Sequence, residues 1–104
     1  NFKPELKLVL ISEIKTKTNI PLVLHGGSAN PDDEIAESVK RGINKINISS
    51  DVKDALYQEL RKTLAKYPRI REPFELYLDA IDAMKEVIFH KIELFNDVDK
   101  AQYY

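Results

Sequence analysis

Residues 22–28 read Leu-Val-Leu-His-Gly-Gly-Ser, so an apolar run ends there at a histidine, two glycines and a hydroxyl. Residues 45–51 read Lys-Ile-Asn-Ile-Ser-Ser-Asp and repeat this layout with an asparagine, two hydroxyls and a carboxylate. Each segment leads into residues that are typical of a helix start. The order strand, polar loop and helix therefore occurs twice. In α/β enzymes, sites lie at the carboxyl ends of parallel strands.

The rest of the chain alternates between helical and strand-like patterns. Apolar residues at spacings of three and four predict amphipathic helices. These cover about residues 4–17, 31–41, 52–67 and 74–95. A continuous apolar run at residues 20–24 predicts a strand that is covered on both faces, and residues 43–48 predict a second strand. The polar tail, residues 96–104, is expected to fray apart from its terminal tyrosines.

Three residues are predicted to cap these helices. Asn30 is a favourable N-cap, and Pro31 after it suits the first helical position. Asp51 is expected to cap the following helix in the same way. Gly42 is predicted as a C-terminal cap, because glycine adopts the left-handed backbone conformation at little cost.

Length and composition bound the class of protein. With 104 residues the chain is one domain at most, and its net charge of -1 gives no electrostatic reason to expect nucleic acid or an anionic membrane as partner. The absence of cysteine excludes disulfides and thiolate metal sites, and it fits a reducing cytoplasm. No apolar run approaches the roughly 20 residues that span a bilayer.

Two parallel strands cannot form a closed sheet, and an apolar strand needs strand neighbours on both edges. The chain also begins without methionine and enters a helix almost at once. We therefore expect residues 1–104 to be the last part of a larger α/β barrel rather than a complete small fold.

The loop after the first strand allows several kinds of chemistry. His25 could be a metal ligand, a general base or a core histidine bonded to a backbone carbonyl. Gly26 and Gly27 would let the backbone approach an anion, to which the Ser28 hydroxyl could donate. A tight strand-to-helix turn would require the same glycines for its backbone angles, so both interpretations stay open.

The second loop supports a similar hypothesis. Asn47 contributes an amide at the strand end, and Ser49 and Ser50 add hydroxyls at a helix start, which suits a phosphate or sugar oxygens. A plain capping sequence would use the same residue types. His90 lies within the long final helix and is interpreted as a flank or surface residue.

Together these segments resemble the C-terminal third of the class II zinc-dependent ketose-bisphosphate aldolases, the fructose- and tagatose-bisphosphate aldolases. The resemblance covers about residues 4–101, nearly the whole chain. The segments that carry it are residues 22–28, 31–35, 45–48, 83–95 and Asp51. It implies an α/β fold in which the chain supplies the last two βα units and the closing helix of a TIM (β/α)8 barrel. Residues 1–104 would then be a C-terminal fragment of that single domain.

The resemblance also implies roles for residues of the first loop. His25 matches the family's third zinc-binding histidine. Gly26, Gly27 and Ser28 match its phosphate loop, which also helps to hold a monovalent cation. The usual glycine and small residue that follow are replaced by Ala29-Asn30, which stiffens the turn.

In the second loop, Asn47 matches the asparagine that contacts dihydroxyacetone phosphate near the reacting carbon. Ser49 and Ser50 fall where the family usually has Asp-Thr, a pair that binds the phosphate and hydroxyls of the same substrate. Ser49 thus removes a charged acceptor and puts the sugar specificity in doubt. The family's other two zinc histidines and its catalytic aspartate belong to earlier strands, so no catalytic residue is assigned here.

The function implied by the resemblance is that of a lyase of carbohydrate metabolism and glycolysis. Such an enzyme reversibly cleaves a ketose 1,6-bisphosphate, fructose or tagatose, into dihydroxyacetone phosphate and an aldehyde, with Zn2+ polarising the ketone. The expected partner is the phosphorylated sugar, and the expected assembly of the intact cytoplasmic parent is a homo-oligomer, a dimer or tetramer. A non-catalytic phosphate-binding partner subunit of an aldolase-like barrel is the alternative. A free-standing phosphate-binding module is disfavoured by the unclosed sheet.

Overall fold

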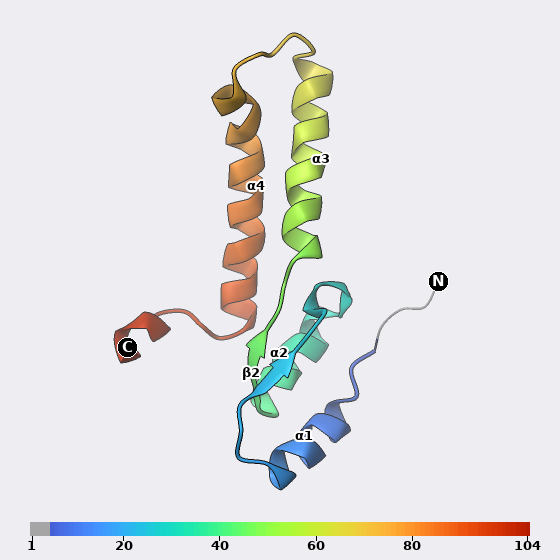
Figure 1. The fold of residues 1–104 in the computed structure, drawn as a ribbon, viewed down its shortest axis with the longest axis vertical. Coiled ribbons are helices and arrows are strands. Elements are labelled where there is room, and N and C mark those ends of the chain that lie inside the picture. Colours follow the sequence, from blue (N-terminus) through green and yellow to red (C-terminus); the bar gives the residue numbers. More distant parts are fainter. Residues whose placement is uncertain (1–4) are drawn as a thin grey trace. The chain divides into compact units, whose positions relative to one another are not determined.

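The computed structural model describes residues 5–104, which divide into two compact units. The first unit holds the described residues up to Ser49 together with Ile92–Tyr104, and the second holds Ser50–Lys91. Figure 1 follows the elements of each unit along the chain. Within residues 5–104, no helix combines the length and the apolar character that crossing a membrane requires.

The first unit contains the predicted alternation of helices and strands. Its elements are α1 (Leu8–Lys17), β1 (Leu22–Leu24), the 3-10 helix η1 (Gly27–Ala29), α2 (Asp32–Lys40), β2 (Ile43–Ile46) and the 3-10 helix η2 (Lys100–Tyr103). Both strands are shorter than the apolar runs that predicted them. The predicted start of the first helix near Pro4 lies outside the described residues. The tail was expected to fray, but η2 gives it a helical turn.

The two strands form a parallel pair, as the sequence predicts. Leu22 is opposite Ile43 and Leu24 is opposite Ile46, with a register irregularity between Leu22 and Val23. At this irregularity the Leu22 N–H donates to the Asn44 side-chain oxygen over 3.0 Å, so an amide side chain replaces a backbone partner. Helix α2 is the connection that returns the chain to the same end of the sheet, as a parallel pair requires.

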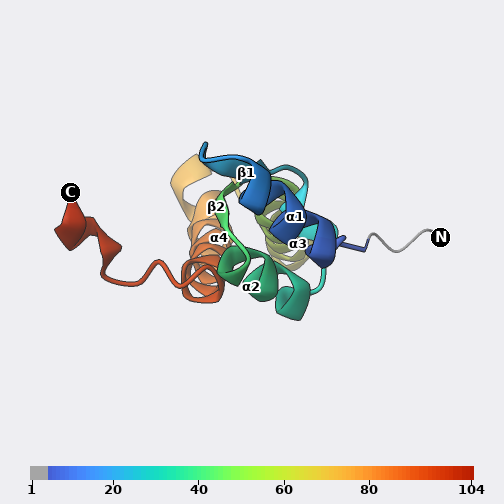
Figure 2. The ribbon, with the colours of Figure 1, turned by 90° about the horizontal axis from the view of Figure 1, so that it is seen from below.

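Helices α1 and α2 pack against each other, and α2 also lies against β2 (Figure 2). The Arg41 guanidinium, just after α2, donates to the Ser12 hydroxyl on α1 over 3.2 Å. In α2 the side chains of Ile35 and Ser38 are fully buried, and the Ser38 hydroxyl donates to the Ile35 carbonyl over 2.7 Å. Helix α2 is therefore held against both α1 and β2.

The prediction that the first strand is covered on both faces is wrong for this chain. Val23 in the middle of β1 is 45% exposed, and Ile20 just before β1 is also exposed. The physical reason is that side chains of a strand point to the two faces of the sheet, and the described residues leave the face that carries Val23 partly uncovered.

The predicted N-cap at Asn30 is also wrong. Helix α2 begins at Asp32, with Pro31 in the N-cap position and no capping bond from a side chain. The Asn30 amide instead donates to the Gly26 carbonyl over 3.3 Å, so it closes the preceding loop. Acidic residues in the first turn of α2 supply the negative charge that a helix N-terminus favours.

The other two predicted caps have different outcomes. Helix α3 (Ser50–Lys66) begins one residue before Asp51, so Asp51 lies within the first turn and the N-cap prediction is wrong. The C-terminal cap at Gly42 is confirmed. Gly42 has a φ of +111° just after α2, and its N–H donates to the Val39 carbonyl over 3.1 Å.

The second unit is a helical hairpin. Helix α3 runs to Lys66, and α4 (Pro73–Leu94) returns beside it (Figure 1). Thr63 of α3 and Ala80 of α4 are buried. Because the alanine side chain is small, other atoms can approach the backbone of α4 closely at this position. The apolar stripes of these helices were predicted to be core, yet Leu64, Ile81 and Ile88 are more than 40% exposed. The described chain therefore covers the stripes only in part.

Ile35 provides a direct test of the packing in the first unit. Because its side chain is 1% exposed, Ile35→Ala should lower the free energy of unfolding by about 2–5 kcal/mol, and Ile35→Val by about 0.5–1.5 kcal/mol. Chemical denaturation of both variants measures this graded loss. Equal effects of the two variants would contradict the assignment of Ile35 to the core.

Candidate functional site

The first polar loop begins where β1 ends. His25 follows Leu24 directly and is exposed. Gly26 then takes a left-handed backbone conformation with φ of +69°, which glycine adopts without the steric cost that a side chain would impose. The sequence thus turns sharply after His25, and the imidazole lies at the carboxyl end of the strand.

Gly27 is required for a different reason, which is space. It is buried at the start of η1, and a Cβ atom added to it would lie 2.7 Å from Ile46 Cγ2 and 3.2 Å from Ile48 Cδ1. The absence of a side chain therefore lets the first loop pack directly on the segment around β2. The turn explanation left open by the sequence is sufficient for both glycines, and it leaves an anion-binding role possible.

Backbone hydrogen bonds join the two loops beyond the ends of the strands. The Asn47 N–H donates to the Leu24 carbonyl over 2.9 Å, and the Gly27 N–H donates to the Asn47 carbonyl over 3.3 Å. Further along both loops, the Ser49 N–H donates to the Ser28 hydroxyl oxygen over 3.3 Å. The loops predicted from the sequence therefore lie side by side at the same end of the sheet.

The side chains of His25 and Asn47 meet at this end. Their Nδ1 and Nδ2 atoms are 3.0 Å apart, within hydrogen-bonding distance. A neutral imidazole has one N–H and one lone pair. If the amide nitrogen donates to Nδ1, that lone pair is occupied, whereas if the amide is turned so that its oxygen accepts from Nδ1–H, the Nε2 lone pair is available. In either arrangement Asn47 controls how His25 can bind a further atom.

His25 is suited to serve as one ligand of a metal. With the amide oxygen of Asn47 accepting from Nδ1–H, the Nε2 lone pair of this exposed imidazole would have the orientation that zinc-binding histidines use. Within residues 5–104, however, no group of three or more histidine, cysteine, aspartate or glutamate side chains is placed to hold a metal ion. The described chain thus offers one imidazole to a site and not a complete ligand set.

The remaining candidates are distributed over both units. The first unit brings together most of the residues singled out in the sequence: His25, Gly26, Gly27, Ser28, Asn47 and Ser49. Ser50 is the first residue of α3 and belongs to the second unit. His90 lies on α4 and is exposed, which confirms its interpretation as a surface residue.

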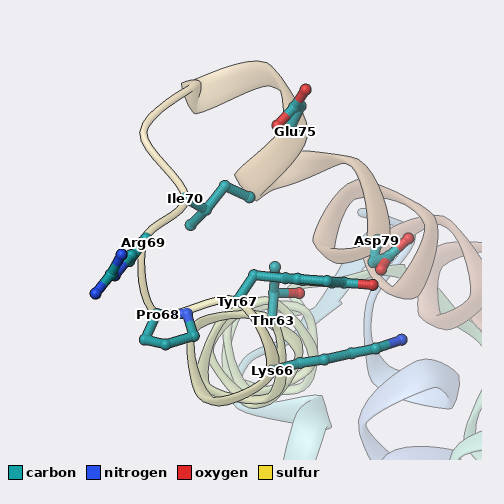
Figure 3. Close-up of a pocket in the computed structure, with 8 residues that line it drawn as sticks. All are labelled: Thr63, Lys66, Tyr67, Pro68, Arg69, Ile70, Glu75 and Asp79. Atoms are coloured by element: carbon teal, nitrogen blue, oxygen red, sulfur yellow. The ribbon is translucent and has the colours of Figure 1, made fainter.

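A cavity of about 550 Å3 at the turn between α3 and α4 was not anticipated from the sequence (Figure 3). Tyr67 and Ile70 line it, and Lys66 lies 5.1 Å from the centre of the Tyr67 ring. Charged residues of both signs also line it. Lys66 and Arg69 are basic, and Glu75 and Asp79 of α4 are acidic. The segment between the two helices carries no periodic pattern, so the sequence alone gives no signal for this cavity.

Comparison with known proteins identifies the family. The model of the class II fructose-bisphosphate aldolases matches residues 1–100. The chain belongs to the class II fructose-bisphosphate aldolase family. The family resemblance inferred from the two loops and the final helix is thereby confirmed.

Two curated aldolases match almost the whole chain. A fructose-bisphosphate aldolase of Geobacillus stearothermophilus is 32% identical over 99 residues, covering 95% of this chain and 34% of that protein. A 6-phospho-5-dehydro-2-deoxy-D-gluconate aldolase of Bacillus licheniformis is 36% identical over 99 residues, with coverage of 95% and 34%. The chain thus spans about a third of the length of these relatives.

A solved aldolase structure has the same arrangement of elements. The crystal structure of the YdjI aldolase from Escherichia coli K12 matches with a TM-score of 0.82 and 28% sequence identity. The match covers 94% of this chain and 36% of that one. The described residues therefore form a mixed α/β fold that this aldolase also contains.

The two glycines of the first loop allow a matched pair of substitutions. Gly27→Ala should force Ile46 and Ile48 to move and should cost about 1–3 kcal/mol of unfolding free energy, as overpacking does. Gly26→Ala meets no atom within 4 Å and should cost about 1 kcal/mol through its left-handed backbone alone. Chemical denaturation measures both. A Gly27→Ala variant as stable as the native protein would contradict the close approach of the loops.

Proposed function

We propose that residues 1–104 are the C-terminal fragment of a class II aldolase (β/α)8 barrel and supply its last two βα units and its closing helix. Three observations support this proposal. The strands are parallel and adjacent, each has an open edge on which a further strand could pair, and apolar residues of β1 and α4 remain exposed. In a closed barrel these edges and side chains would be covered.

The proposed reaction of the complete barrel is the reversible cleavage of a ketose 1,6-bisphosphate, fructose or tagatose, into dihydroxyacetone phosphate and an aldehyde. The relative named fructose-bisphosphate aldolase supports it, and the relative named for 6-phospho-5-dehydro-2-deoxy-D-gluconate makes that phosphorylated sugar acid a second candidate substrate. The observation that carries the proposal is the contact between His25 and Asn47 at the carboxyl ends of two adjacent parallel strands.

In this proposal the two loops bind the phosphate of the substrate. Ser28 accepts a hydrogen bond from the Ser49 N–H, which leaves its own hydroxyl proton available to a phosphate oxygen. Gly26, Gly27 and Ser50 would contribute backbone or hydroxyl donors. Each hydrogen bond to a charged group contributes about 1.5–3 kcal/mol, so several of them can hold a phosphate without a lysine in the loops. The first loop would also help to hold a monovalent cation.

The proposed metal ligand is His25, and the proposed substrate contact beside it is Asn47. A zinc ion at such a site supplies Lewis-acid polarisation of a carbonyl oxygen. The further ligands and the catalytic acid or base would come from other strands of the barrel. Asn47, by holding the imidazole of His25, would keep the ligand in one orientation while its carbonyl, bonded to Gly27, keeps the loop closed.

We propose a cytoplasmic homo-oligomer, a dimer or tetramer, as the assembly of the complete enzyme, with the phosphorylated sugar as its partner. The cysteine-free composition fits this compartment. Exposed aromatic side chains on α4, Phe74 at 74% and Phe89 at 60%, could be covered by other parts of the barrel or by another subunit.

The two histidines of the chain provide the test of the metal site. In the complete barrel, His25→Ala should sharply lower the zinc content and abolish cleavage of the bisphosphate, because one imidazole ligand is lost. His90→Ala should leave both unchanged, since His90 lies on α4. Elemental analysis of the purified variants and a coupled assay for dihydroxyacetone phosphate give the two readouts.

Each result has a clear consequence for this assignment. Full zinc content and normal turnover in the His25→Ala variant would refute His25 as a ligand. If the unmodified complete protein binds inorganic phosphate but holds no zinc and cleaves no bisphosphate, the non-catalytic partner subunit becomes the better proposal.

Ser49 provides the test of sugar specificity. Its hydroxyl lacks the negative charge of an aspartate, so its hydrogen bonds to sugar hydroxyls should be weaker. Ser49→Asp should change the ratio of kcat/KM between fructose and tagatose bisphosphates several-fold while changing the melting temperature little. Ser49→Ala serves as the control for loss of the hydroxyl. An unchanged ratio in Ser49→Asp would remove this residue from the specificity of the enzyme.

A further inference from the structure

An ion pair joins the two helices of the hairpin. Lys91 Nζ lies 2.8 Å from Asp51 Oδ2, and the two side chains are 12% and 26% exposed. Other ion pairs of these helices, Lys62 with Glu59 and Lys85 with Asp82, span one turn of a single helix, and their lysines are 69% and 60% exposed. Exposed pairs of this kind contribute little to stability, whereas a partly buried pair is screened less by salt.

The pair lies at the open end of the hairpin, opposite the turn that connects the helices. Asp51 is the second residue of α3, and Lys91 stands in the last turn of α4, which ends at Leu94. The carboxylate thus sits at a helix N-terminus and the ammonium at a helix C-terminus, where each charge is favoured by the helix dipole. Consequently, the ion pair anchors the first turn of α3 to α4. Each of its two charges is also stabilised by the dipole of its own helix.

This anchor lies one residue from a proposed substrate contact. Ser50 is the first residue of α3, and the terminal N–H groups of a helix have no partner within the helix. A helix terminus frays readily unless a side chain holds it. To fray here, the turn would have to separate Asp51 from Lys91 and so break a partly buried ion pair.

We propose that the ion pair between Asp51 and Lys91 is a positioning element that holds the first turn of α3 in the conformation that presents Ser50 to phosphate. This inference rests on the proposed function, because it assigns Ser50 to the phosphate site. Lys91 acts through Asp51 and the backbone of α3 and makes no contact with the substrate. Its effect is therefore on the affinity for phosphate and not on the chemical step.

A hollow of about 340 Å3 beside the pair guides the choice of variants. It is lined by Asp51, Glu86, Val87, His90 and Lys91. Because it offers space, a guanidinium in place of the ammonium can be accommodated, and Lys91→Arg should keep the ion pair. Lys91→Met removes the charge and keeps the aliphatic stem. Asp51→Asn combined with Lys91→Met removes both charges, so that no partly buried charge is left unpaired.

The experiment measures binding of inorganic phosphate to the complete barrel by isothermal titration calorimetry, with the melting temperature and bisphosphate cleavage recorded for each variant. We expect Lys91→Met to weaken phosphate binding about tenfold and to raise KM more than it lowers kcat. Lys91→Arg should bind within about threefold of the unmodified protein. Lys62→Met, which removes an exposed lysine from α3, should bind as the unmodified protein does.

The double variant separates positioning from stability. It should recover most of the melting temperature lost in Lys91→Met, while its phosphate affinity stays at least fivefold weakened. Recovery of affinity together with stability would overturn the inference, as would a Lys91→Met variant that binds phosphate like Lys62→Met. In both of those cases the proposed function stands. If the unmodified protein neither binds phosphate nor cleaves a bisphosphate, the proposed function fails, and the inference fails with it.

Discussion

The parallel pairing of β1 and β2 is the interaction on which the candidate site depends. It continues past the strands, because the Asn47 N–H donates to the Leu24 carbonyl and the Gly27 N–H donates to the Asn47 carbonyl. These backbone bonds bring two loops that are separated by a whole helix to one end of the sheet. Without these bonds nothing would hold the His25 and Asn47 side chains in contact. Neither loop alone contains the candidate site.

Close packing beneath the loops makes this pairing specific. Gly27 lies so near the segment around β2 that a single methyl group would collide with Ile46 and press against Ile48. Ile35 of α2 lies under the same glycine, so the helix that connects the strands also supports the loop. The polar end of the sheet therefore rests on apolar contacts. The fold itself therefore requires both glycines, Gly27 for close packing and Gly26 for its left-handed backbone conformation.

The pattern of exposure agrees with our proposal that the chain is part of a larger barrel. Residues such as Val23, Ile81 and Ile88 follow the periodicities of buried strands and helices, yet they are more than 40% exposed here. Hydrophobic burial contributes about 25 cal/mol per Å2, so such surfaces favour coverage by further structure. The chain spans about a third of its curated relatives, and a (β/α)8 barrel would supply the missing strand neighbours in our proposal.

The sequence by itself determined the order of helices and strands, the parallel pair, the surface position of His90 and the meeting of the loops that contain His25 and Asn47. These follow from periodicity and from the rule that a strand, a helix and a strand in succession form adjacent parallel strands. Only the tertiary structure decided that Asn30 closes a loop and that Asp51 pairs with Lys91 instead of capping α3. A capping residue is predicted from its near neighbours in the sequence alone. The partner of a polar side chain, in contrast, is one of the groups that packing brings close, and Lys91 lies 40 positions after Asp51 in the chain.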